Sequence, residues 1–325
     1  MLNIIYKKLK GERMEEKLVS VLIPTYNVQD FIEQAVGSII NQTYKNIEII
    51  IVDDCSSDKT FEKLKKLAKQ DSRIKLLRND TNLKICKTLN KALKESKGEY
   101  IVRMDGDDIS DKDRIEKQIE YLEKNQEIAL VGNSVKNIDR KNNIFSTTKY
   151  CSEFKKLKKL ARYGTPVLHI WAARREVYEK LDGYREIPYV EDYDFLLRMI
   201  TSGYKFSNLE NYYGYSVRFR QGNTATTNGI EQIKAFEYVR KMYEERKKSK
   251  NKLDSFNEEK FLEFIKVCES DRKKYIKSQK KLEKVFKEKN KVKKIFFLLN
   301  SIILSKYQLK KIIRRMLFKI YGNKI

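Results

Sequence analysis

Residues 100–108, Y-I-V-R-M-D-G-D-D, decide the predicted fold. The apolar residues at the start of this stretch are typical of a strand, which leads directly into three carboxylates at Asp105, Asp107 and Asp108. Carboxylates at the end of a strand must be solvated, paired or offset by a metal ion. Because Gly106 lets the backbone approach closely, Asp105 and Asp107 can offer oxygens to one divalent cation. An Asp/Gly-rich turn without a ligand is the alternative for a D-x-D pattern on its own.

Two further apolar runs precede this stretch, at residues 18–23 and 47–52, and each again leads into a polar loop. Segments with helical spacing separate the runs, so strands and helices alternate as in a parallel α/β sheet. Ligands of such sheets bind beyond the carboxyl ends of the strands. The loops at 24–27, 53–58 and 105–108 are therefore expected to form one pocket. Neither G-x-G-x-x-G nor G-x-x-x-x-G-K-[ST] occurs, which disfavours a dinucleotide fingerprint and a P-loop.

The second half of the chain adds fewer signals. A helix is predicted over 190–200 with Glu191 and Asp192 in its first turn, where acidic residues also occur simply because they favour a helix N-terminus. The only histidine, His169, lies in a region of mixed short strands and helices, and a lone histidine is more often structural than catalytic. Two short strands are expected within 205–220, followed by helices from 231 to the end.

Charge is concentrated at the C-terminus. The formal net charge is +25, and residues 251–325 alone hold 22 Lys/Arg against 8 Asp/Glu, a net of +14. This excess suggests an anionic partner, either a membrane or nucleic acid. Residues 292–320 have apolar positions at helical spacing with lysines and arginines between them, which predicts one basic amphipathic helix. Such a helix either lies on an anionic membrane or packs on the domain with a solvated basic face. No run of about 20 apolar residues predicts a membrane span, and four widely spaced cysteines fit a reducing cytoplasm.

Four motifs in order carry a family resemblance: V-S-V-L-I-P-T-Y-N at 19–27, V-D-D-C-S-S-D at 52–58, G-E-Y-I-V-R-M-D-G-D-D at 98–108, and E-D at 191–192. Together they resemble family 2 of the inverting glycosyltransferases, which use nucleotide sugars on a GT-A fold. The resemblance covers about residues 17–224, and the segment 169–185 is also similar to the family's segment before the E-D pair.

The resemblance implies a Rossmann-like, mostly parallel mixed sheet flanked by helices. The domains expected are an N-terminal extension (1–17), a GT-A domain (18–230) with a nucleotide-sugar half (18–132) and an acceptor half (133–230), and a helical, lysine-rich C-terminal region (231–325).

The resemblance also implies roles for individual residues. The residues expected to bind the nucleotide are Pro24, Thr25, Tyr26, Asp53, Asp54 and Asp105. Asp107, together with Asp105, is expected to bind Mn²⁺ or Mg²⁺, and Asp192 is expected to be the catalytic base with Glu191 near the acceptor. Further substrate contacts are expected from His169, Arg218 and Lys84. Two positions depart from the family pattern. Lys84 stands where the family commonly has glycine, and Arg218 is the nearest candidate where the family often has histidine.

The predicted function is metal-dependent, inverting transfer from a UDP-sugar to a polysaccharide or lipid-linked oligosaccharide. The expected setting is cell-surface polysaccharide synthesis, such as capsule or lipopolysaccharide, by a peripheral protein on the cytoplasmic face of the plasma membrane. Two alternatives stay open at this point: a nucleotidyltransferase acting on sugar phosphates, and a basic nucleic-acid-binding protein. Because the charge lies in a helical tail, we expect membrane rather than nucleic acid as the anionic partner.

Overall fold

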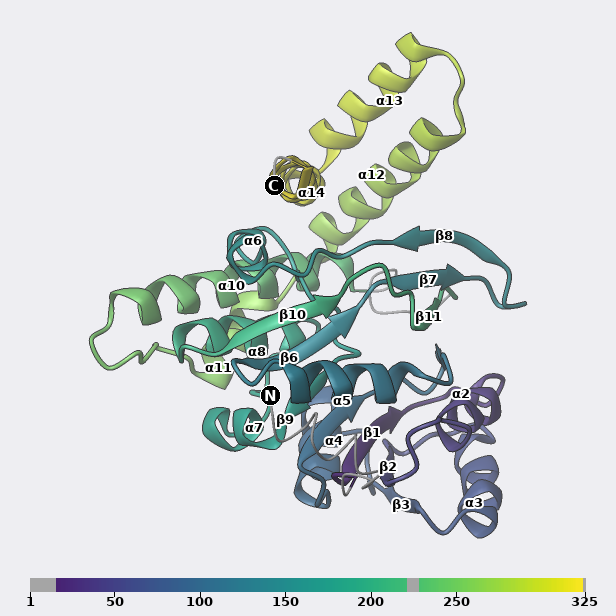
Figure 1. The fold of residues 1–325 in the computed structure, drawn as a ribbon. Helices are drawn as coiled ribbons and strands as arrows, with labels where there is room; N and C mark the ends of the chain where they lie inside the picture. Colours follow the sequence, from purple (N-terminus) through teal and green to yellow (C-terminus); the bar gives the residue numbers. More distant parts are fainter. Residues whose placement is uncertain (1–15, 221–227, 324–325) are drawn as a thin grey trace.

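A computed structural model describes residues 16–220 and 228–323 (Figure 1). Its centre is a seven-stranded sheet in the order β10-β6-β9-β4-β1-β2-β3. The strands are β1 (Val19–Thr25), β2 (Ile47–Asp53), β3 (Ile74–Arg78), β4 (Tyr100–Arg103), β6 (Ile128–Asn133), β9 (Ala172–Arg174) and β10 (Lys205–Leu209). All neighbours are parallel except β9, which runs antiparallel to both β4 and β6. The predicted mostly parallel mixed sheet is thus confirmed.

Helices cover both faces of this sheet, which explains the continuous apolar runs of its central strands. One face packs on α2 (Ile32–Ile40), α3 (Thr60–Gln70) and α5 (Arg114–Lys124) through residues such as Val21 and Ile49. The other packs on α4 (Lys84–Lys94), α7 (Arg175–Leu181), α8 (Glu191–Thr201) and α10 (Gly229–Lys248) through residues such as Leu22 and Ile50. Alternate residues of one strand therefore belong to two different cores.

A second sheet has four strands in the order β5-β11-β7-β8. Its members are β5 (Ile109–Ser110), β11 (Tyr215–Arg218), β7 (Val135–Ile138) and β8 (Ile144–Thr148). Since β5 follows the acidic loop 105–108 directly and pairs with β11, this sheet brings the end of β11 against that loop.

The C-terminal region is helical, with α10, α11 (Glu258–Ile265), α12 (Glu269–Lys287), α13 (Lys291–Leu304) and α14 (Lys306–Asn323). α12 and α13 form a hairpin that projects from the body, whereas α14 returns and packs on α10, α12 and α6 (Phe154–Leu160) (Figure 1). The expectation of one helix over 292–320 is wrong. Ser305 has extended backbone angles (φ −151°, ψ 120°) and separates α13 from α14. Ser301, four residues earlier in the last turns of α13, is buried and donates to the Ser278 carbonyl. Within the described residues, no helix is both long and apolar enough to cross a membrane.

Candidate functional site

The acidic loop 105–108 lies at the carboxyl end of β4, beside the end of β1. A Cβ at Gly106 would lie 2.8 Å from Cγ2 of Thr25, so glycine permits this close approach. The Asp105 N–H donates to the Tyr215 hydroxyl at 3.1 Å. Asp108 is buried, and its Oδ1 accepts from the Arg218 backbone N–H at 2.7 Å. The loop is therefore fixed by both sheets.

His169 lies between two of the predicted site carboxylates. Its Nε2 is 2.8 Å from Oδ2 of Asp105, and its Nδ1 is 3.8 Å from Oδ2 of Asp192. Burial opposes protonation of His169, but the charge of Asp105 outweighs it and raises the pKa of His169 to about 10. In the opposite sense, His169 and Arg103 overcome the effect of burial and hold the pKa of Asp105 below its usual range. The imidazolium thus links the acidic loop to the start of α8.

Glu191 is held differently from its neighbour Asp192. Its Oε1 accepts from Nη1 of Arg103 at 3.0 Å, and both side chains are buried. Burial raises the pKa of Glu191, with the charge of Arg103 opposing this. Sequence reasoning did not single out Arg103, although an arginine inside the apolar run Y-I-V-R-M is itself a signal, since a buried guanidinium needs an acidic or hydrogen-bonding partner.

The candidate Arg218 and the overlooked Arg220 have different surroundings. Arg218 is 1% exposed, and its guanidinium donates to the backbone carbonyls of Asp107 and Asp139 and to Gln34. Arg220 instead places Nε 2.7 Å from Oδ2 of Asp107. Burial and the charge of Asp105 raise the pKa of Asp107 despite Arg220. In the described structure, Arg220 therefore contacts the predicted metal ligand directly, whereas Arg218 supports the loop.

The loop after β2 is held by its own carboxylates. Oδ2 of Asp53 accepts from the Ser56 N–H at 3.0 Å and lies 3.3 Å from Nε of Arg78. Asp54 is also buried; its Oδ1 accepts from Nδ2 of Asn79 and from the Leu83 N–H, and its Oδ2 accepts from the Lys84 N–H at 2.9 Å. Asp53 thus fixes the loop after β2, and Asp54 joins that loop to the start of α4.

Lys84 has a positive φ of 68°. Glycine adopts this conformation without the Cβ clash that other residues incur, which gives a physical reason for the glycine that the resembled family commonly has here.

The predicted nucleotide residues at the end of β1 differ in exposure. Pro24 and Thr25 belong to the buried strand, whereas Tyr26 is 48% exposed. The next residue, Asn27, accepts through Oδ1 from the Ser57 N–H at 2.9 Å. Because β1 lies between β4 and β2, the three predicted loops meet at one edge of the sheet, as expected.

Asp105 and Asp107 fit a divalent cation. Asp105 Oδ1 is buried without a hydrogen-bond partner, and Nε of Arg103 lies 3.6 Å from it. Burial and the charge of Asp105 raise the pKa of Asp107, so a cation between the two carboxylates would offset their repulsion. Over residues 16–220 and 228–323, no group of three or more His, Cys, Asp or Glu side chains is arranged to hold a metal. Two carboxylates suffice for an ion such as Mg²⁺, which usually takes its other ligands from water and substrate phosphate.

Comparison with known proteins agrees with the resemblance. The family described as glycosyl transferase family 2 matches residues 20–182. An uncharacterized glycosyltransferase of Haemophilus influenzae is 34% identical over 229 residues, which cover 65% of this chain and 68% of the relative. The Escherichia coli UDP-Glc:alpha-D-GlcNAc-diphosphoundecaprenol beta-1,3-glucosyltransferase WfgD is 39% identical over 120 residues, covering 37% of this chain and 47% of the relative.

Solved structures show the same fold. S. aureus TarS 1–349 in complex with UDP-GlcNAc superposes with a TM-score of 0.58 at 17% identity, covering 91% of this chain and 88% of that one. The mannosyltransferase PcManGT from Pyrobaculum calidifontis, in complex with GDP-Man and Mn²⁺, gives a TM-score of 0.56 at 14% identity, covering 99% and 93%. The GT-A fold expected from the motifs is confirmed, and the family match over half of the sequence shows that this chain belongs to glycosyl transferase family 2.

Proposed function

We propose that this glycosyltransferase moves a sugar from a UDP-sugar to a hydroxyl of a polysaccharide or lipid-linked glycan, with inversion and with the help of a divalent cation. Family membership favours glycosyl transfer over the two alternatives, nucleotidyl transfer and nucleic-acid binding. The choice of UDP and of a lipid-linked acceptor is supported by the names of WfgD and of the TarS complex.

The observation that carries this proposal is the position of Asp192. It lies in the first turn of α8, and His169 separates it from Asp105 of the acidic loop. A base at this position is close to the carboxylates that would meet the donor diphosphate. Its neighbour Glu191 is already paired with Arg103, which leaves Asp192 as the better candidate for accepting a proton.

The proposed reaction is a single displacement. Asp192 accepts the proton of the acceptor hydroxyl as that oxygen attacks the anomeric carbon from the face opposite the diphosphate, so the configuration inverts. Protonated His169 holds Asp105 and faces Asp192, which fixes the distance between the base and the acidic loop. Arg103 fixes Glu191 beside it. A cation bound by Asp105 and Asp107 would supply charge stabilisation to the leaving diphosphate.

The test is the substitution Asp192→Asn, which keeps the shape of the side chain and removes its basicity. We expect transfer to fall by about 10² to 10⁴-fold while UDP binding, measured by calorimetry, is retained. The anomeric configuration of the product, read by NMR, tests inversion. Turnover close to that of the unaltered enzyme would exclude Asp192 as the base, and a product of retained configuration would exclude the single displacement.

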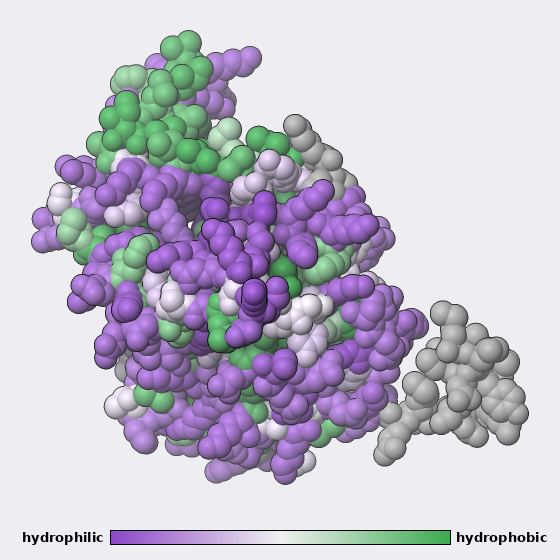
Figure 2. All heavy atoms as spheres, turned by 90° about the vertical axis from the view of Figure 1, so that its left-hand side faces the viewer, coloured by the Kyte–Doolittle hydropathy of each residue, from purple (hydrophilic) through white to green (hydrophobic). Residues whose placement is uncertain are grey.

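We also propose that the enzyme is peripheral to the cytoplasmic membrane face, held by the α12–α13 hairpin. Five apolar side chains of α13 are more than half exposed: Val292, Ile295, Phe296, Leu299 and Ile303. Figure 2 shows apolar atoms gathered at the end of the molecule where Figure 1 draws this hairpin. Positive charge comes from lysines 291, 293 and 294 on the same helix, and from lysines 284, 287 and 289 at the end of α12 and in the turn between the two helices. Apolar side chains bordered by lysines match an anionic lipid surface.

A matched pair of variants tests this contact. Ile295 on α13 and Ile144 on β8 are both 59% exposed. We expect Ile295→Glu to reduce co-sedimentation with phosphatidylglycerol vesicles several-fold, and Ile144→Glu to leave it unchanged. Equal effects of both variants would contradict the assignment to the hairpin. The assignment would also be contradicted if the unaltered protein did not bind vesicles and ultracentrifugation showed a dimer that Ile295→Glu dissociates.

A further inference from the structure

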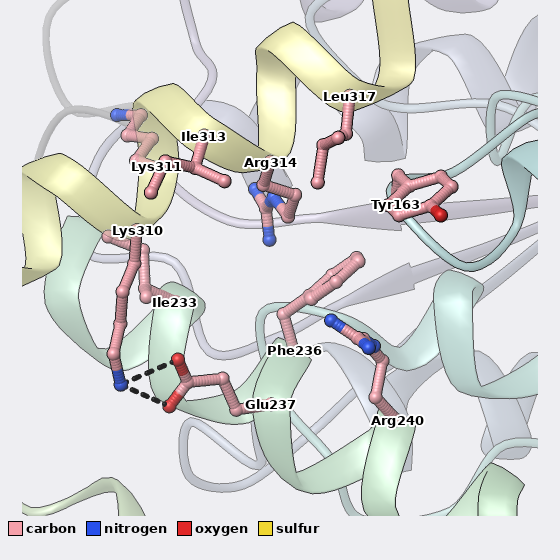
Figure 3. A pocket seen from close by; sticks show the side chains of 10 residues that line it. All are labelled: Tyr163, Ile233, Phe236, Glu237, Arg240, Lys310, Lys311, Ile313, Arg314 and Leu317. Carbon is pink, nitrogen blue, oxygen red and sulfur yellow. Dashed lines mark hydrogen bonds and ion pairs between the residues drawn. The ribbon is translucent and has the colours of Figure 1, made fainter. Parts of the chain in front are cut away.

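A cavity of about 200 Å³ lies between α10 and α14, away from the sheet edge that forms the candidate active site. Figure 3 shows Arg240 and Arg314 directed toward the ring of Phe236 in its middle. Ile313 and Leu317 add apolar wall, so the cavity combines guanidinium groups with hydrocarbon.

The cations of this cavity outnumber its acids. The lining contains Arg240, Lys310, Lys311 and Arg314 but one carboxylate, Glu237, which pairs with Lys310 at 2.7 Å. In the parts of the chain that the structure describes, no acidic side chain forms an ion pair with Arg240 or Arg314.

What Arg314 and Lys311 do contact is aromatic. The guanidinium of Arg314 lies 4.0 Å from the centroid of Phe236, and Nζ of Lys311 is 3.2 Å from the Tyr275 hydroxyl. Burial lowers the pKa of Lys311 to about 8 and that of Arg314 to about 10. Partly buried cations without acidic partners carry a desolvation penalty that a bound anion would offset.

We propose that this cavity binds a phosphate group, supplied either by the headgroup of an anionic lipid or as free phosphate. A guanidinium group can donate two parallel hydrogen bonds to two oxygens of a phosphate, and two guanidinium groups in one cavity favour phosphate over a simple carboxylate. The cavity is smaller than the ~300–1,000 Å³ of pockets that enclose whole small-molecule ligands. It therefore suits a headgroup rather than a whole nucleotide.

The apolar walls and the position of the cavity favour the lipid source. α14 packs against α13 and α12, the hairpin to which we assign membrane contact, so the choice of lipid rests on that proposed function while the phosphate site itself does not. Phe236 of the cavity also stacks on Tyr193 with ring centroids 4.2 Å apart. Tyr193 follows Asp192, so a headgroup in the cavity would bind directly behind the start of α8.

The experiment is calorimetric titration of the full-length protein with dihexanoyl phosphatidate, inorganic phosphate and dihexanoylglycerol, which has the same chains without phosphate. Arg314→Gln and Arg240→Gln each remove one cation of the cavity. Their controls are Arg315→Gln and Lys241→Gln, which remove the same charge one residue away from the lining. Loss of a charged hydrogen bond should weaken phosphatidate binding by about 10- to 100-fold in the cavity variants, and by much less in the controls.

Each outcome decides one point. Stronger binding of phosphatidate than of inorganic phosphate supports the lipid source, and equal binding supports a free-phosphate site. The inference is overturned by no binding of either, by binding of dihexanoylglycerol as strong as that of phosphatidate, or by equal losses in all four variants. Arg240 is exposed, so Arg240→Gln remains informative if Arg314→Gln fails to fold. UDP titration of the same variants should be unchanged, which separates a failure here from a failure of the proposed transferase activity.

Discussion

Replacing Asp194 should destabilise the protein, although this residue lies two positions from the proposed base. Its side chain is buried, and Oδ2 accepts from Nε of Arg198 at 2.8 Å and from Nε of Arg185 at 3.0 Å. Arg185 also donates to Asp254 at 2.9 Å, and Asp254 pairs with Arg246. Asp194→Asn would remove the carboxylate with which Arg198 pairs and would leave Asp254 as the carboxylate shared by Arg185 and Arg246.

The pKa of Asp194 gives the size of the effect. Burial by itself would raise this pKa, but Arg198 and Arg185 outweigh burial and lower it to about 2. Compared with an ordinary pKa of ~3.9, this lowering corresponds to about 2–3 kcal/mol in favour of the charged form. Removing one partner of a buried ion pair costs about 3–5 kcal/mol in other proteins. We therefore expect Asp194→Asn to lower the free energy of unfolding by about 3 kcal/mol.

The pH dependence has a definite sign. Because the pKa of Asp194 is lower in the folded than in the unfolded state, its contribution is complete above about pH 5 and is lost as the pH falls from ~4 toward 2. The stability difference between the unaltered protein and Asp194→Asn should accordingly be constant near neutrality and shrink below pH 4.

Urea denaturation followed by circular dichroism at pH 7 and pH 3 measures both quantities. Asp192→Asn is the matched control. Its carboxylate is partly exposed and contacts His169 and the N–H of Tyr193, so it should change stability by no more than about 1 kcal/mol. A loss below about 1 kcal/mol in Asp194→Asn, or an equal loss in both variants, would refute the structural role assigned to Asp194.

Three further predictions concern the loops. Asp107→Ala should abolish the part of UDP binding that depends on Mn²⁺, and calorimetric titration with and without the ion checks this; binding that is equally metal-dependent in the variant would remove Asp107 as a ligand. Gly106→Ala should lower the free energy of unfolding by about 1–3 kcal/mol, because its Cβ would lie 2.8 Å from Cγ2 of Thr25. Adding Thr25→Ser, which removes that methyl group, should restore part of the loss, and no recovery would contradict the clash. Lys84→Gly should raise the free energy of unfolding by about 0.5–1 kcal/mol by relieving its positive φ; an equal gain in Lys84→Ala, which keeps the strain, would exclude that cause.

Much of the fold was predictable because strands buried on both faces leave continuous apolar runs. Residues 18–23 and 47–52 are such runs, and the acidic and polar residues that follow them meet at one sheet edge. In contrast, β9 has three residues, Ala172–Arg174, which is too short to show a period. The break at Ser305 was also missed, since the apolar spacing continues through it and tertiary packing of the serines decides where the helix ends.

The candidate site was predictable only in part. Its acidic residues stand in recognisable motifs, but their partners come from distant segments. Arg220 meets Asp107 because β11 pairs with β5, and no local pattern announces that contact. Likewise, the positions of Asp53 and Asp54 were evident, whereas the use of their oxygens to fix loop backbone follows from the folded geometry. Arg103 was the one partner that the sequence itself could have revealed.

The antiparallel strand β9 has a mechanical consequence for the enzyme. It follows β6 by about forty residues in the sequence, yet it is hydrogen-bonded between β4 and β6. A hinge between the predicted nucleotide-sugar half (18–132) and the predicted acceptor half (133–230) would have to break the backbone pairing on both sides of β9, so we expect no large-scale closure between them. His169, three residues before β9, is consequently carried by the same rigid body as Asp105. We therefore expect substrate entry and product exit to depend on movement of loops at the sheet edge, with His169 held at a fixed position relative to the acidic loop.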